Sequence, residues 1–321
     1  MNSPLTVDTL AHEIRDFINQ RRIQYVLLQD RRRWFQLCTC LDVIEDCELA
    51  IAAYASPSAP RGPDPDKGET YLVLFGLLQA FFVQQDAVEN LAESLGMTSS
   101  LERQPGLTRV RDVRNMTSGH PTKRGRGEAV SFHAINRSSL SMAAFELVTA
   151  SKDGTQGFQT YSVLDLIADQ RHGIRAALAV ILERIRERDR LHREQFRHEK
   201  LEEILDGHVG YSLEKLGEGL SPLSPSGGPL ARMSVDELAK ALDDFQGALE
   251  RRELSLDTYE AVRDVVWRIR YALIQLARYF EGLPDSDITT IQIAEMVIAY
   301  VRHGIRGLRE MAAEIDADYQ S

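Results

Sequence analysis

The stretch that indicates the fold class most clearly runs from Glu69 to Leu95 and reads ETYLVLFGLLQAFFVQQDAVENLAESL. Its apolar residues recur at steps of three and four, which is the period of an α-helix. They form two adjoining strips, Leu72, Phe75, Leu78 and Phe82 in one and Leu74, Leu77, Phe81, Val88 and Leu91 in the other. A helix that is apolar around so much of its circumference belongs at the centre of a bundle. The sequence therefore predicts a central helix over 69–95 that ends at Gly96.

Further helices are predicted on both sides of this segment. Residues 5–56 contain neither glycine nor proline and keep the helical spacing, either as one very long helix or as two joined near Arg21-Arg22. A loop is indicated by Pro57, Pro60, Pro63 and Pro65. A shorter helix is expected from about Pro105 to Ser118, and another over 162–206.

Between the last two of these helices the pattern becomes that of β-strands. Apolar and polar residues alternate over 128–161, and Asp153-Gly154 is typical of a hairpin turn, so we expect a small antiparallel β insert. Glycine, proline and serine dominate 207–232, which predicts a linker. The chain is thus expected to be mainly α, with a helical bundle over 1–206 and a C-terminal domain of three helices over 233–321.

The charge and the cysteines disfavour several classes of protein. The formal charge is −10 and the pI is about 5.4, which disfavours bulk binding of nucleic acid. Cys38, Cys40 and Cys47 are an odd number without a nearby histidine cluster, so we expect buried apolar side chains rather than disulfides or zinc. The N-terminus lacks a basic region followed by an apolar one, and Tyr71–Val83 is too short to span a bilayer. We expect a cytoplasmic protein with no membrane partner, no metal and no cofactor.

The segment 103–137 departs from this acidic balance. It contains eight arginine and lysine residues against two acidic ones, which favours an anionic ligand. Arg114 and His120 lie at its centre. An imidazole moves protons near neutral pH, and a guanidinium holds two phosphate oxygens at once. RNA carries its own nucleophile, the ribose 2′-hydroxyl, so this pair is suited to RNA cleavage without a metal ion. A helix that stops at Gly119 would let His120 fold back beside Arg114.

This motif resembles the signature of bacterial HEPN-domain ribonucleases. Five residues separate Arg114 and His120, Asn115 follows the arginine, and Pro121-Thr122 follow the histidine. A preceding apolar helix that contains Gln84-Gln85-Asp86 adds to the resemblance, which covers about residues 5–205. It implies a helical bundle that dimerises, so that the arginines and histidines of both subunits face one cleft.

The resemblance also implies roles and partners. Cleavage would be metal-independent and leave a cyclic phosphate, with Arg114 stabilising the phosphate, His120 acting as base or acid, and Asn115 orienting the pair. Members of the family act as toxins of toxin–antitoxin systems or in antiviral defence, so an antitoxin or defence partner of the C-terminal helices is expected beside RNA and a second copy. Phosphate contacts are expected from Arg111, Lys123, Arg124 and Arg126. Thr122 stands where members silenced by adenylylation carry tyrosine, so that regulation is not expected.

An alternative interpretation assigns no catalytic role to Arg114 and His120. Arg114 and His120 also suit a helix C-terminus, where cationic side chains bind free carbonyl groups. The chain would then be a non-catalytic dimeric HEPN scaffold, or an RNA- or nucleotide-binding interaction module whose C-terminal helices recruit a partner.

Overall fold

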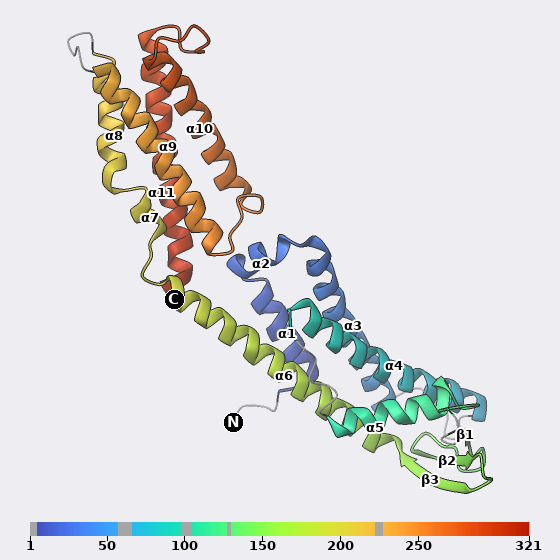
Figure 1. Ribbon diagram of the computed structural model, residues 1–321. Helices are drawn as coiled ribbons and strands as arrows, with labels where there is room; N and C mark the ends of the chain where they lie inside the picture. Colours follow the sequence, from blue (N-terminus) through green and yellow to red (C-terminus); the bar gives the residue numbers. More distant parts are fainter. Residues whose placement is uncertain (1–4, 57–65, 98–103, 127–129, 222–226, 321) are drawn as a thin grey trace. The chain divides into compact units, whose positions relative to one another are not determined.

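The computed structural model describes residues 5–56, 66–97, 104–126, 130–221 and 227–320 (Figure 1). Within these ranges the chain is mainly helical with one small antiparallel sheet, which confirms the predicted fold class. The predicted proline loop at 57–65 lies outside the described residues. The chain divides into two compact units. Unit 1 comprises residues 1–19 and 30–186, and unit 2 comprises 20–29 and 187–321.

The N-terminal region forms three helices, where one or two were predicted. They are α1 (Val7–Ile18), α2 (Arg21–Leu28) and α3 (Arg31–Ala55). The first break lies close to the predicted joint at Arg21-Arg22. The second comes at Asp30, whose extended backbone starts α3 and whose carboxylate accepts a hydrogen bond from the Arg33 amide at 3.1 Å. An aspartate in this position caps a helix N-terminus, and this is a local signal that the apolar spacing does not contain.

The predicted central helix is α4 (Lys67–Ser94). Asp66 caps its start by accepting the Glu69 amide at 2.8 Å, and the chain turns away at Gly96, whose φ of +70° favours glycine. Leu74, Leu78 and Phe81 are completely buried. In the described part of the chain, α4 is also the one helix whose length and hydropathy would allow it to cross a membrane, a property that core helices share.

The β insert consists of β1 (Ser131–Ile135), β2 (Ala144–Ser151) and β3 (Gln156–Ser162), paired antiparallel in that order. The predicted hairpin turn is confirmed, with Gly154 at φ +85°. One face of the sheet buries Phe145, Leu147 and Tyr161 in the core of unit 1, together with residues of α3, α4 and α6 (Val163–Phe196). The insert is therefore part of the unit 1 core. Residues 127–129, at the predicted start of the insert, lie outside the described ranges.

The prediction of a linker over 207–232 is wrong, because helices occupy much of this range. Helix α8 (Gly207–Glu218) occupies its first half, after the short α7 (Leu201–Ile204), and α9 begins at Gly227. Val209, Leu213 and Leu216 recur at helical spacing and are buried. A side chain at Gly210 or Gly217 would meet nothing within 4 Å, so these glycines leave the buried side of α8 intact. The glycines made the composition of this amphipathic helix resemble that of a linker.

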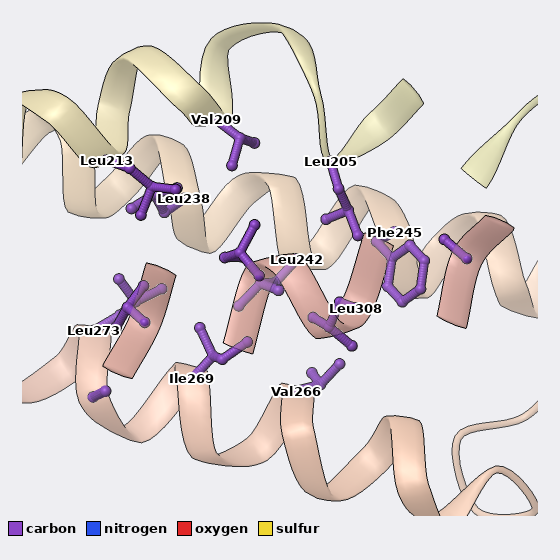
Figure 2. Close-up of a cluster of buried hydrophobic side chains, with 14 of the residues drawn as sticks. Leu205, Val209, Leu213, Leu238, Leu242, Phe245, Val266, Ile269, Leu273 and Leu308 are labelled. Atoms are coloured by element: carbon purple, nitrogen blue, oxygen red, sulfur yellow. The ribbon is translucent and has the colours of Figure 1, made fainter. Parts of the chain in front are cut away.

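Unit 2 is built on α8, α9 (Gly227–Arg251), α10 (Glu260–Phe280) and α11 (Ile291–Gln320). Figure 2 shows Leu242, Phe245, Ile269 and Leu308 meeting between these helices. The three C-terminal helices predicted over 233–321 are confirmed, although α9 starts earlier. The predicted boundary at residue 206 is wrong, because the units divide within α6, at residues 186 and 187.

Two of the three cysteines confirm the expected burial. Cys40 and Cys47 are buried, Cys38 is half-buried, and all three are free thiols. Burial and the neighbouring carboxylates of Asp46 and Glu48 raise the pKa of Cys47 to about 11. A thiol with such a pKa stays protonated and unreactive at neutral pH.

Candidate active site

The predicted motif begins on α5 (Pro105–Arg114), a short helix of unit 1. Pro105 suits the first turn of the helix, because the backbone amides there have no carbonyl acceptor within the helix. Leu107, Val110 and Val113 follow at steps of three and are buried. These side chains anchor α5, and Arg114 occupies its last position.

The helix does not continue in α-helical form to Ser118 as predicted. Asn115–Gly119 form a wider, π-helical turn, in which the His120 amide donates to the Asn115 carbonyl at 2.7 Å. The buried Thr117 hydroxyl donates to the Val113 carbonyl at 2.8 Å and stabilises the turn. His120 then leaves the helical conformation, with φ −135° and ψ 53°, because the proline that follows it disfavours the α region. The backbone is not the fully extended one that was predicted for this position. Its side chain is exposed.

The guanidinium of Arg114 is held by neutral groups. Its Nη1 donates to Asn115 Oδ1 at 3.1 Å, its Nη2 donates to Gln79 Oε1 at 2.9 Å, and its Cζ lies 4.2 Å from the centre of the Phe82 ring. Each terminal nitrogen carries two hydrogens and gives one of them to these acceptors. The second hydrogen on each is suited to an oxygen of a bound phosphate.

Gly119 brings the guanidinium close to the backbone that leads into His120. A Cβ atom built on Gly119 would lie 2.8 Å from Arg114 Nη1 and 3.1 Å from Asn115 Oδ1. The Arg114 guanidinium therefore lies against the backbone of the residue that immediately precedes His120. Through the π-helical turn, the structure brings together Arg114, Asn115 and the backbone from which the His120 side chain extends.

Three other arginines of this region are neutralised within the chain. Their ion pairs are Arg109 with Asp169 at 2.7 Å, Arg111 with Asp86 at 2.5 Å and Arg124 with Asp112 at 2.6 Å. Arg114 makes no ion pair with any residue that the structure describes. Among the predicted phosphate contacts, Arg111 and Arg124 thus hold carboxylates, whereas Lys123 and Arg126 are exposed.

A network of buried glutamines supports Arg111, and it was not predicted from the sequence. Gln84, Gln85 and Gln170 are buried and bonded to one another through Gln170, at 2.8 Å to Gln85 and 3.0 Å to Gln84. Gln85 Oε1 also accepts from Arg111 Nε at 3.0 Å. Satisfied buried networks rigidify a core. This one links α4, α5 and α6, and its signal was the pair of glutamines in an otherwise apolar helix.

Another histidine nearby has a structural role. His133 on β1 is buried, and its ring nitrogens lie 3.0 Å from the Ser131 hydroxyl and 3.1 Å from that of Thr149. Burial and the positive charge of Arg124 lower the pKa of His133, which favours the neutral ring. In the described ranges, no three His, Cys, Asp or Glu side chains gather closely enough to hold a metal ion.

Replacing Gly119 by alanine is expected to reduce activity while preserving the fold. The new methyl group would displace the Arg114 guanidinium, the end of a flexible side chain, and misplacement of about 1 Å reduces rates by up to ~10²-fold. The resemblance to HEPN ribonucleases then predicts that RNA cleavage, measured as initial rates, falls roughly 10- to 100-fold in Gly119→Ala. Gly76→Ala on α4 is the control, since a Cβ there meets nothing within 4 Å. Equal rates in both variants would contradict the placement of Arg114.

Comparison of the chain with protein-family models, with curated proteins and with solved structures found no match.

Proposed function

We propose that this chain is a metal-independent endoribonuclease of HEPN type. The observation that carries the proposal is the state of Arg114, which is held in place by Gln79, Asn115 and Phe82 while its positive charge is not neutralised by any described carboxylate. The guanidinium lies beside the backbone next to an exposed histidine. A preorganised cation and a proton-transfer group carried on the same short turn are suited to the transition state of phosphodiester cleavage.

In the proposed reaction, the ribose 2′-oxygen attacks the adjacent phosphorus. The bond from phosphorus to the 5′-oxygen breaks, which leaves a 2′,3′-cyclic phosphate on one fragment and a 5′-hydroxyl on the other. A base takes the 2′-hydroxyl proton, and an acid gives a proton to the leaving 5′-oxygen. Arg114 donates its two remaining terminal N–H groups to the non-bridging oxygens, where negative charge builds up.

The two proton transfers favour a homodimer. One imidazole cannot accept one proton and donate another in the same step, whereas two can act as base and acid. We propose that His120 and His120 of the partner subunit divide these roles at a shared cleft. We further propose a cytoplasmic toxin or antiviral-defence role, in which unit 2 binds an antitoxin or another defence component.

The function is tested by incubating the purified chain with a panel of labelled single-stranded and structured RNAs in EDTA. We expect cleavage that EDTA does not reduce. The upstream fragments should end in a cyclic phosphate, and the downstream fragments should accept a label from polynucleotide kinase without prior phosphatase treatment. A folded protein that cuts no RNA of the panel would refute the nuclease proposal and favour the non-catalytic binding module.

A further inference from the structure

The open face of the β insert carries two exposed phenylalanines. Residues that pair directly across an antiparallel sheet point to the same face. Phe132 pairs with Ala150, and Phe158 pairs with Val148, which in turn pairs with Ala134. All five side chains therefore lie on the face opposite to the buried Phe145 and Leu147. Phe132 is 43% exposed and Phe158 is 63% exposed.

The two rings do not cover one another. β2 lies between their strands, and the residue that faces Phe132 on β2 is two positions from the residue that faces Phe158. Two strand spacings and a two-residue offset separate their Cα atoms by about 12 Å. The exposure of 43% for Phe132 and 63% for Phe158 shows that both residues are accessible to a ligand. The small side chains of Ala134 and Ala150 leave the surface between them low.

Backbone hydrogen bonds connect β1 of this face to the segment that follows His120. Arg124 and Ser131 exchange two backbone hydrogen bonds of 2.9 Å, and the His133 amide donates to the Pro121 carbonyl at 2.7 Å. Phe132 lies between the two bonded residues of β1. Its position relative to the turn after His120 is therefore set by backbone hydrogen bonds on both sides.

The connecting turn is cationic. Residues 121–126 contain three cationic side chains and no acidic one. Asp112 neutralises Arg124, while Lys123 and Arg126 are exposed. A cationic turn beside exposed aromatic rings combines the two features that bind single-stranded nucleic acids, namely phosphate attraction and base stacking.

We infer that the open face of β1–β3 is a stacking platform for the unpaired bases of single-stranded RNA. The inference rests on the proposed ribonuclease function and names its substrate class. Phe132 and Phe158 each stack on one base, and Lys123 and Arg126 bind the phosphates that lead toward Arg114 and His120. Duplex RNA keeps its bases paired and stacked inside the helix, so it does not use this face.

The test measures binding in a His120→Ala background, in which RNA stays intact. The probes are a fluorescein-labelled single strand of mixed sequence and the same strand annealed to its complement. Phe132→Ala and Phe158→Ala should each weaken single-strand binding about 10-fold, and together about 100-fold. Phe132→Trp and Phe158→Trp should keep the affinity because they keep a stacking ring. Phe35→Ala on α3, where the phenylalanine is 67% exposed, is the matched control and should bind as the parent does.

Unchanged single-strand affinity in the double alanine variant would overturn the platform, as would an equal loss of duplex binding. A dimer that dissociates in that variant, at unchanged RNA affinity, would also overturn it by showing that the face joins two copies. The platform and the nuclease can fail separately. RNA cleavage by the parent with no effect of the phenylalanines on binding refutes the platform alone, and phenylalanine-dependent binding without any cleavage refutes the nuclease alone.

Discussion

Arg114→Ala and His120→Ala are each expected to lower kcat/KM for RNA cleavage by about 10³-fold or more. Loss of a positioned acid or base costs ~10²–10⁴-fold, and loss of a preorganised cation at the developing charge costs a similar factor. Neither side chain belongs to the apolar core, so the far-ultraviolet circular dichroism and the thermal midpoint should change little. The measurement is the initial rate of cleavage in EDTA, compared with the parent chain.

Arg109→Ala is the matched control for Arg114. Both arginines are on α5, but Arg109 is neutralised by Asp169, so its removal should leave cleavage nearly unchanged. Arg114→Lys should remain as inactive as Arg114→Ala, because an ammonium group cannot replace the planar guanidinium between Gln79, Asn115 and a phosphate. If Arg109→Ala lost as much activity as Arg114→Ala, a general effect of positive charge would replace the specific role of Arg114.

Asp189→Ala is expected to destabilise unit 2 by about 3–5 kcal/mol, the usual cost of removing one member of a buried ion pair. Asp189 lies in the part of α6 that belongs to unit 2, is 7% exposed, and pairs with Arg22, which is 6% exposed. The Arg22 guanidinium also lies 5.2 Å from the Tyr319 ring. Burial and the positive charge of Arg22 lower the pKa of the adjacent His192, so a neutral ring is favoured there. Without Asp189, the charge of Arg22 stays buried with too little compensation.

Hydrogen–deuterium exchange of the α10 and α11 peptides in increasing urea gives the stability of unit 2 separately from that of unit 1. Glu187→Ala is the control on the same helix, because Glu187 pairs with Arg190 in full contact with solvent and should hardly affect exchange. A double variant, Arg22→Met with Asp189→Leu, should recover much of the loss, since apolar replacements remove both buried charges. Equal protection in Asp189→Ala and the parent would show that the pair does not stabilise unit 2.

Some elements could be predicted from the sequence because their signals are local. The spacing of apolar residues predicted α4, the glycine at position 154 predicted the hairpin, and the basic segment marked the surroundings of Arg114. The prediction failed for α8, where glycines on the exposed side resembled a linker in composition. It also failed for the N-terminal region, where the cap at Asp30 divides a continuous helical pattern.

The helical class, the small sheet, and the placement of an arginine and a histidine around a helix end all follow from local sequence patterns. Helical and strand periods depend on neighbouring residues, so they can be read along the chain. Which arginines of α5 are paired with a carboxylate depends instead on tertiary contacts. Arg109, Arg111 and Arg124 meet carboxylates, while Arg114 meets two side-chain amides, an aromatic ring and a glycine. Those contacts join residues up to 60 positions apart, and no local pattern encodes which of them the packed helices bring together.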